Sequence, residues 1–275
     1  MTFFNILDLC IIMLYFIGAL FFLGGILGIN QTLKKSALYA TILGFLLHSA
    51  DLVIKLQSNV VFTFSQTQFY FSFLAWSFLL IYLIIWWRMQ LQFLALTAAP
   101  LALILFTSSL AVSTSDLSIP SQLSALWFSL HIIALFLSIA LLAMAFGAGL
   151  FYLHKDKQLK NKAKPNKLRK GFPSLTSLDR VNHIAVSTGF PLFTVGMLSG
   201  FVWAKFTWGD FFSWDPKELI SIVIWFIFAY LFHQRITTGW KGRKPARLAA
   251  WLFVLSIISL LVVNFYFPTH HSFRP

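Results

Sequence analysis

Residues 123–154 read LSALWFSLHIIALFLSIALLAMAFGAGLFYLH and contain no Asp, Glu, Lys or Arg. A helix needs about 20 predominantly apolar residues to cross the hydrocarbon core of a bilayer, so this stretch is long enough to span a membrane. Seven further stretches read in the same way. The eight predicted transmembrane helices cover about 3–29, 36–55, 65–87, 91–112, 123–154, 181–204, 217–235 and 248–267. The sequence therefore predicts an all-α integral membrane protein, with residues 1–275 forming a single polytopic membrane domain.

The composition of the chain excludes the other broad classes of protein. Of its 275 residues, 59% are apolar and 11% are charged, whereas soluble domains average about 45–50% and 25%. The 32 Phe and 10 Trp residues are far too many buriable groups for a disordered chain. The single Cys10 excludes a disulfide framework and thiolate zinc sites. The first residues lack the basic segment and cleavage site of a signal peptide, so we expect the first helix to be retained.

The basic residues are distributed unequally between the two sides of the predicted membrane. Seventeen of the 21 Lys and Arg residues fall on one side, mainly in 155–180 and 235–247. Because cytoplasmic loops carry the excess of Lys and Arg, this side is expected to be cytoplasmic, or stromal in a plastid, with both termini extracytoplasmic. The net charge of +13 then indicates a topological anchor in the loop 155–180, with contact to anionic lipid, and no nucleic-acid partner.

The segment that joins the sixth and seventh helices on the outer side is unusually aromatic. Residues 203–218 read WAKFTWGDFFSWDPKE and include Glu218, the only Glu of the chain. Aromatic rings at a membrane interface often form only an aromatic belt. That interpretation does not explain the density of rings, the acids, or Gly209, which we expect to let a backbone approach closely. The segment therefore predicts a surface for a flat apolar ligand with a polar edge.

Several histidines are placed at informative depths. His131 is expected within the fifth helix, about one turn beyond the outer boundary of the hydrocarbon core, and His270 and His271 lie just beyond the eighth helix. Imidazole is a common axial ligand of haem iron, and two can bind it from opposite faces. His233 is about 22 Å below the outer face at ~1.5 Å per residue. Intramembrane ionisable groups are functional candidates by default, although His233 could instead cap the helix beside Arg235.

Several segments of the sequence resemble those of a known family. WGDFFSWDPKE at 208–218 is similar to the tryptophan-rich WWD signature of haem-handling membrane proteins. The most similar members form the CcsA family, also called ResC, of system II cytochrome c biogenesis; CcmC and CcmF carry relatives of the signature. The segments 126–138 and 228–235, Asn264 and the final His-Ser-Phe also resemble this family, over roughly 60–273. Two departures are Phe212, where the signature has Trp, and an ending without the family's Tyr-Gly.

The resemblance implies both a function and a set of site residues. The chain would carry haem b across the membrane and present it for covalent attachment to a CxxCH segment of apocytochrome c, acting with a CcsB-type partner. His131 and His271, with His270 as substitute, would ligate the iron outside, and haem would enter at His233. The expected haem contacts are Trp203, Lys205, Trp208, Gly209, Phe211, Phe212, Trp214, Asp215 and Lys217. The membrane would be a bacterial cytoplasmic membrane or a plastid thylakoid.

Within this set we expect different roles for the charged groups. Lys205 and Lys217 are the better partners of the haem propionates, whereas Asp215 is expected to order the loop, because two anions repel. One face of the second helix carries His48, Asp51 and Lys55. These residues indicate either a structural polar stripe or part of the lining of a cavity that holds the haem.

Three functions stay open on the sequence. The first is haem delivery and ligation, in which the chain could be a component of a holocytochrome c synthase. The second is a regulatory or assembly protein of the HemX or YpjD type without ligation activity. The third is a small-solute transporter in which the aromatic segment is a gate. A coloured purified protein with a bis-imidazole haem spectrum would favour the first.

Overall fold

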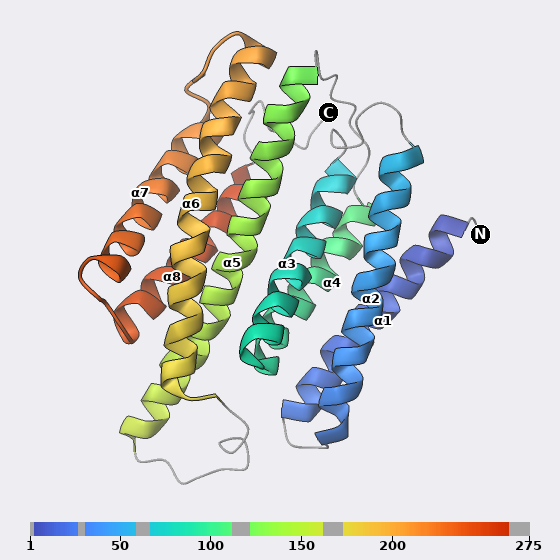
Figure 1. The fold of residues 1–275 in the computed structure, drawn as a ribbon, viewed down its shortest axis with the longest axis vertical. Coiled ribbons are helices and arrows are strands. Elements are labelled where there is room, and N and C mark those ends of the chain that lie inside the picture. The colour runs from blue at the N-terminus through green and yellow to red at the C-terminus, as the bar shows by residue number, and fades with distance from the viewer. Residues whose placement is uncertain (1–2, 27–30, 59–66, 112–121, 162–172, 264–275) are drawn as a thin grey trace. The chain divides into compact units, whose positions relative to one another are not determined.

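The computed structural model describes residues 3–26, 31–58, 67–111, 122–161 and 173–263 (Figure 1). These residues form eight helices that are long and apolar enough to cross a membrane, and they contain no strand. The all-α class and the eight predicted spans are therefore confirmed. The helices are α1 (Phe3–Ile26), α2 (Gln31–Ser58), α3 (Thr67–Met89), α4 (Ala95–Ala111), α5 (Gln122–Lys160), α6 (Leu175–Trp208), α7 (Pro216–Ile236) and α8 (Arg243–Ile258). A short helix η2 (Gln92–Leu94) precedes α4, and a π-helical turn η4 (Ser259–Val263) continues α8.

Several helices extend beyond their predicted ends. α5 continues to Lys160 and α6 begins at Leu175, so both enter the region 155–180 that was expected to be a loop. At its other end α6 continues to Trp208, which places part of the segment 203–218 on a helix. Hydropathy marks only the apolar part of a helix. Backbone hydrogen bonds can continue into polar turns, so the helix ends lie outside the apolar core.

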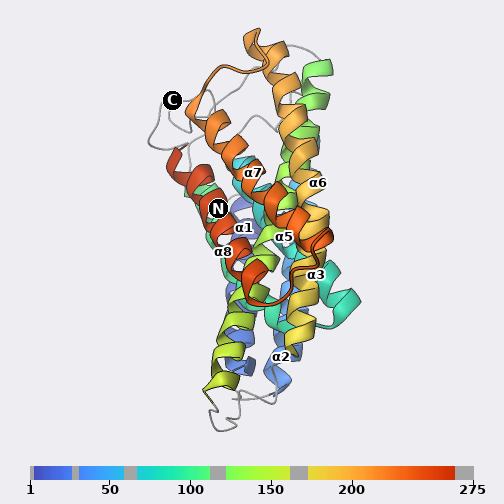
Figure 2. The ribbon, with the colours of Figure 1, turned by 90° about the vertical axis from the view of Figure 1, so that its left-hand side faces the viewer.

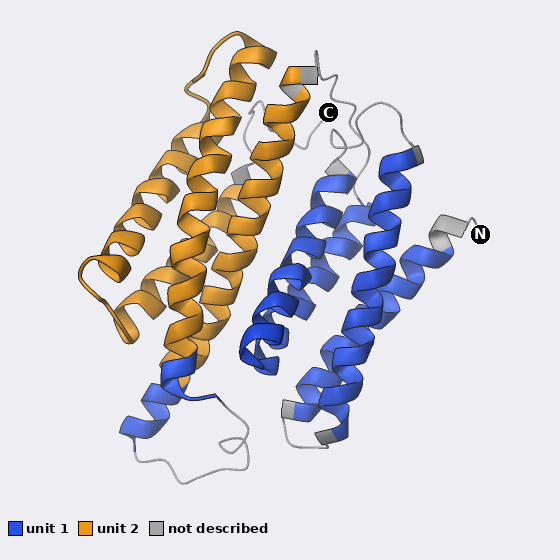
Figure 3. Cartoon of the chain, in the orientation of Figure 1, with its two compact units in different colours: residues 1–63, 67–113, 155–177 blue, residues 64–66, 114–154, 178–275 orange. Residues whose placement is uncertain are grey.

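The helices divide into two compact units, coloured separately in Figure 3. Unit 1 contains residues 1–63, 67–113 and 155–177, and therefore α1 to α4. Unit 2 contains residues 64–66, 114–154 and 178–275, with most of α5 and α6 and all of α7 and α8. That all eight helices form one membrane domain stays a prediction.

In unit 1, small residues bring α1 and α2 close together. A Cβ atom added at Gly18 would lie 2.7 Å from Thr41 Oγ1, and one added at Gly44 would lie 2.8 Å from a ring carbon of Tyr15. Small residues at helix contacts are typical of membrane proteins, where packing replaces the hydrophobic driving force. The Tyr15 ring also meets the edge of Phe106 from α4, at 6.1 Å between centroids.

In unit 2, α5 packs along α6 and also contacts α8. A Cβ added at Gly196 of α6 would lie 2.7 Å from Leu135 of α5, and one at Gly149 of α5 would lie 2.8 Å from the carbonyl oxygen of Ala246. Figures 1 and 2 both show the first turns of α5 beside the last turns of α6, at the end where the chain turns into α7. This end of unit 2 carries most of the predicted site residues.

The opposite end of unit 2 is held by a buried ion pair. Arg235 near the end of α7 donates to Asp179 Oδ1 of α6 at 3.0 Å and to the Trp240 carbonyl at 2.7 Å. The same Asp179 oxygen accepts the backbone N–H of Gly242 at 2.8 Å. The side chain of Arg235 is only 1% exposed. These contacts fix the turn between α7 and α8, and sequence analysis did not anticipate them.

Candidate functional site

Only part of the aromatic segment 203–218 is a connection between helices. Trp203, Lys205 and Trp208 lie on the last two turns of α6, and only residues 209–215 connect α6 to α7. Lys217 is in the first turn of α7. The predicted site residues 203–217 therefore stay together at one end of unit 2, but three of them have the fixed spacing of a helix.

Gly209 ends α6, and its backbone conformation is one that favours glycine. Its φ is +92°, and its N–H donates to the Lys205 carbonyl at 3.2 Å. Glycine is favoured after a helix because it adopts this left-handed conformation without strain. No atom of the described residues lies within 4 Å of a Cβ built at Gly209. Within the described residues the backbone conformation accounts for the glycine, and a close approach of a ligand to Gly209 stays a prediction.

The sequence Asp215-Pro-Lys-Glu218 forms the start of α7. Asp215 is the N-cap residue, and its Oδ1 accepts the backbone N–H of Lys217 at 2.7 Å. Pro216 occupies the first turn, where its missing N–H costs nothing. Glu218 Oε2 accepts the N–H of Asp215 at 3.4 Å, which completes a capping box. Both acids are buried. Asp215 thus orders this connection, as the charge argument predicts.

Glu218 also binds the residue before Trp214. Its Oε2 accepts the backbone N–H of Ser213 at 2.8 Å, and its Oε1 accepts the Ser213 hydroxyl at 3.1 Å. Trp214 lies between the two bound amides. It has φ = +60°, and 75% of its surface is exposed.

The aromatic rings of the site differ in burial: Trp203 is buried, Phe211 and Trp214 are exposed, and Trp208 and Phe212 are half-buried. Trp203 is 4% exposed and lies against Phe128 of α5 and Trp208, with centroids 4.7 and 5.0 Å away. Trp214 contacts the Phe212 ring edge-on at 5.1 Å. Phe211 and Trp214 are 56% and 75% exposed. The buried rings therefore belong to the packing of α5 and α6, and the exposed rings are the surface that a flat ligand could contact.

The two lysines predicted as partners of an anionic group differ in what they contact. Lys217 Nζ donates to the carbonyl oxygen of Ser259 at 2.7 Å and to its hydroxyl at 3.2 Å, which ties α7 to the end of α8. Lys205 is exposed, donates to the Gly209 carbonyl and lies 5.5 Å from the centre of the Phe211 ring. Lys205 is therefore the better placed of the two to bind a ligand, because Lys217 serves the helix packing.

His131 is held in one orientation by α6. Its Nδ1 lies 2.7 Å from the Gly196 carbonyl oxygen, and its ring is nearly parallel to Trp203, with an interplanar angle of 19° and 6.5 Å between centroids. A carbonyl oxygen only accepts, so Nδ1 carries the hydrogen. In the neutral ring Nε2 then bears the lone pair. A hydrogen bond of this kind at the far nitrogen is typical of histidines that ligate metals.

His233 lies far from this end of α7. It is in the last turn of the helix, its side chain is exposed, and Thr237 Oγ1 lies 3.3 Å from its Nδ1. His233 is seventeen positions after Pro216, which corresponds to about 25 Å along the helix at ~1.5 Å per residue. The structure thus does not bring His233 to the aromatic segment. His270 and His271, together with Asn264, lie outside the described residues.

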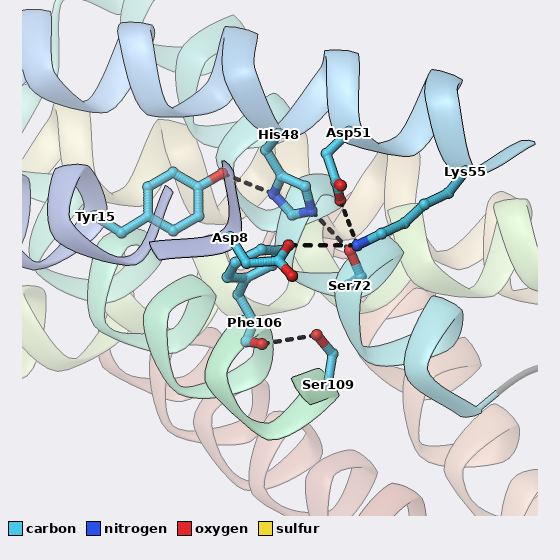
Figure 4. Close-up of polar contacts among 8 residues, drawn as sticks. All are labelled: Asp8, Tyr15, His48, Asp51, Lys55, Ser72, Phe106 and Ser109. Atoms are coloured by element: carbon cyan, nitrogen blue, oxygen red, sulfur yellow. Dashed lines mark hydrogen bonds and ion pairs between the residues drawn. The ribbon is translucent and has the colours of Figure 1, made fainter. Parts of the chain in front are cut away.

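Unit 1 contains a separate polar cluster, shown in Figure 4. The ring of His48 is fully buried; its Nδ1 bonds to the Tyr15 hydroxyl and its Nε2 to the Ser72 hydroxyl, both at 2.8 Å. Lys55 pairs with Asp51 at 2.8 Å and lies 3.4 Å from Asp8. The expected polar stripe therefore consists of two groups of contacts that join α1, α2 and α3. His48 acts as a structural residue there, with both ring nitrogens bonded.

Two features of the site were not predicted from the sequence. The contact of His131 with Gly196 joins residues 65 apart in the chain, and no local pattern could reveal it. The role of Glu218 had a signal, because Asp followed three residues later by Glu is the spacing of a capping box.

Comparison with known proteins places this fold among membrane proteins of cytochrome c assembly. The family model described as "Cytochrome C assembly protein" matches residues 65–271. A CcsA protein from Guillardia theta is 32% identical over 226 residues, covering 73% of each chain. One from Prochlorococcus marinus (strain MIT 9301) is 29% identical over 273 residues, covering 90% of this chain and 88% of its own.

Two further relatives match a smaller part of their own length. A CcsA protein from Gloeobacter violaceus is 50% identical over 97 residues, which are 35% of this chain and 29% of that protein. The solved structure of the cytochrome c haem lyase CcmF aligns with a TM-score of 0.63 at 14% identity, covering 92% of this chain and 45% of CcmF. At that identity the likeness to CcmF concerns the fold alone.

Proposed function

Because this chain belongs to the cytochrome c assembly protein family and, within it, to the CcsA family, we propose that it carries haem b across a membrane and presents it to apocytochrome c. Membership of this family makes it a multi-pass membrane protein with a role in cytochrome c assembly. In the proposal, haem is the substrate and is held at the end of unit 2 that contains 203–218. This end and both termini face the extracytoplasmic side of a bacterial cytoplasmic membrane or of a thylakoid.

The observation that carries the proposal is the orientation of His131. The Gly196 carbonyl, 2.7 Å from Nδ1 of His131, engages that nitrogen, so the lone pair of the neutral ring is on Nε2, the nitrogen that would bind iron. The ring lies beside Trp203, which in turn contacts Trp208 at the start of the aromatic connection. An imidazole oriented in this way, beside a tryptophan that leads to the aromatic connection, supports iron ligation better than it supports a purely structural histidine.

The other residues of the site have complementary roles in the proposal. The exposed rings of Phe211 and Trp214 contact the faces of the haem. Lys205 binds a propionate, since it is an exposed cation beside the Phe211 ring. His271, or His270 in its place, supplies the second axial ligand, so that iron is bound from both sides.

The attachment step requires positioning more than chemical activation. Each cysteine thiol of the CxxCH segment adds across a haem vinyl group, with sulfur bonding to one vinyl carbon and hydrogen to the other. Atoms and electrons balance without an oxidant or reductant. We therefore assign to this chain the task of holding the haem, while its ligands keep the iron from reacting with other molecules. Whether the chain is called a component of a holocytochrome c synthase is a matter of definition, because its task in this step is to hold the haem.

The ligand content of the purified complex tests the axial pair. We would purify the chain from cells that supply haem and express a CcsB-type partner, and expect the spectrum of haem bound by two imidazoles. His131→Gly and His271→Gly should each lower haem content and cytochrome maturation, and added imidazole should restore part of both. His154→Gly, a histidine at the other end of α5, is the matched control. Wild-type haem content in both single variants would contradict the assignment.

The same preparation distinguishes the alternative functions. A colourless complex, obtained with haem supplied and the partner present, would favour a regulatory or assembly protein of the HemX or YpjD type.

We further propose that haem enters at His233, which lies at the opposite end of α7 from Pro216 and would act there with the CcsB-type partner. A His233→Gly variant should lose haem without the imidazole response of the His131 variant, because the missing ligand acts before the haem reaches its final site. Replacement of the neighbouring Gln234 by Ala is a control on the same turn. Full haem content and normal maturation in the His233 variant would mean that this histidine only caps the helix.

A further inference from the structure

We infer that Glu218 is a positioning residue that displays the indole of Trp214 to the ligand. This inference rests on the proposed function for the identity of the ligand, but its structural part can be tested without one. It adds a role to an acid that does not itself contact the haem in the proposal above.

Glu218 binds the residues that precede and follow Trp214 in the chain. Its Oε2 accepts the N–H of Ser213 at 2.8 Å and the N–H of Asp215 at 3.4 Å, which are the residues immediately before and after Trp214. The Ser213 hydroxyl adds a third bond, to Oε1 at 3.1 Å. A single buried carboxylate therefore holds the backbone at both neighbours of Trp214, and we refer to these three contacts as the Glu218 clamp.

The conformation of Trp214 is one that a bulky residue rarely adopts. Its φ of +60° lies in the left-handed region, which is populated mainly by Gly, Asn and Asp. Such strain persists only where surrounding contacts impose it, and it is concentrated at functional sites. The Glu218 clamp is the local contact that can impose it, because it fixes both flanking amides.

The result is an indole that projects from the segment. Trp214 is 75% exposed, whereas Asp215 beside it is buried at 7%. The Phe212 ring meets it edge-on at 5.1 Å and supports it from one side. Neither the strain nor the exposed indole stabilises the isolated protein, so both are suited to an interaction with something outside it. A flat apolar ring is the partner that an indole face fits.

Helix capping alone does not account for these contacts. A capping box needs the carboxylate of Glu218 only at the N–H of Asp215. The two bonds to Ser213 reach beyond the box and are the shorter ones. A capping role predicts a loss of stability when Glu218 is changed, but it predicts no dependence of that loss on which residue occupies position 214.

The first experiment tests the clamp through stability, without haem. Trp214→Ala and Trp214→Gly both remove the indole, but only glycine adopts φ = +60° without strain. We expect the Trp214→Gly protein to melt at a higher temperature than Trp214→Ala. Glu218→Gln should lower the melting temperature more in the Trp214→Gly background than in Trp214→Ala, because alanine leaves its strained φ once the clamp is removed and so recovers part of the lost stability, whereas glycine has no strain to relieve. Equal melting temperatures for the two Trp214 variants, and equal effects of Glu218→Gln in both, would overturn the clamp.

The second experiment measures haem release from the complex to apomyoglobin. We expect Glu218→Gln to release haem roughly two- to twelvefold faster than wild type, which corresponds to one lost aromatic contact. Trp214→Ala should show a similar increase, and the double variant should be no faster than Trp214→Ala alone. Asp210→Asn, which removes a carboxylate from the same connection without contacting the neighbours of Trp214, is the control.

The outcomes of these two experiments distinguish a failure of the proposed function from a failure of the Glu218 clamp. A wild-type complex that holds no haem would refute the proposed function, while the stability comparison would still decide on the clamp. If Glu218→Gln melts at a lower temperature but releases haem at the wild-type rate, Glu218 is only a helix cap and the positioning role is wrong.

Discussion

Gly200 allows a direct test of how α6 orients His131. The two residues face each other so closely that a Cβ added at position 200 would lie 2.6 Å from Cε1 and 3.3 Å from Cγ of the imidazole. Alanine at this position would therefore push the ring away from α6. The hydrogen bond from His131 Nδ1 to the Gly196 carbonyl at 2.7 Å would lengthen or break, and with it the fixed direction of Nε2 would be lost.

Opposing contributions set how much Gly200→Ala changes the free energy of unfolding. Overpacking of a tight contact costs about 1–3 kcal/mol, and the lost hydrogen bond costs about 0.5–1.5 kcal/mol. Alanine is favoured over glycine within a helix by about 1 kcal/mol. We therefore expect Gly200→Ala to destabilise the protein by roughly 0.5–3.5 kcal/mol. The effect on the ligand should be larger than this modest loss suggests, because iron ligation depends on direction.

The assay combines thermal unfolding with the absorption spectrum of the haem-loaded complex. Gly200→Ala should lose the two-imidazole spectrum and regain part of it with added imidazole, as we expect for His131→Gly. Gly189→Ala on the same helix is the control, because its Cβ would contact Phe228 at 3.1 Å and Leu141 at 3.5 Å and not the imidazole. A Gly200→Ala complex with the wild-type spectrum, haem content and melting temperature would refute this account of His131.

Three further substitutions test the roles assigned to buried polar groups. Asp179→Ala should lower the free energy of unfolding by about 3–5 kcal/mol, because it leaves the buried guanidinium of Arg235 without its carboxylate; a loss below about 1 kcal/mol in thermal unfolding would speak against this. Tyr15→Phe should cost about 1–3 kcal/mol, since Nδ1 of the buried His48 loses its partner, and the haem spectrum measured beside the melting curve should not change. Lys217→Met should lower the melting temperature through the lost bonds to α8 while haem release keeps its wild-type rate; faster release at an unchanged melting temperature would show instead that this lysine binds the ligand.

Much of the architecture could be predicted from the sequence because it depends on local properties. A stretch such as 123–154 without a charged side chain has to satisfy its own backbone hydrogen bonds in an apolar surrounding, so it forms a helix wherever it lies in the fold. The start of α7 is also local, because Asp215 and Glu218 have the spacing of a capping box. The helix ends were predicted less well, since hydropathy does not report the turns that continue past the apolar region.

The tertiary structure decided which of the predicted site residues are engaged in helix packing and which are exposed. His131 gains its orientation from Gly196, 65 residues later in the chain, and Lys217 contacts Ser259 rather than remaining exposed. Contacts between distant segments depend on how helices pack, and composition and spacing carry no information about that packing. The sequence therefore determined which chemical groups are gathered near 203–218. Only the packing of α5 to α8 decided that Trp203 is buried and that Trp214 is displayed, because burial depends on neighbours that the local sequence does not contain.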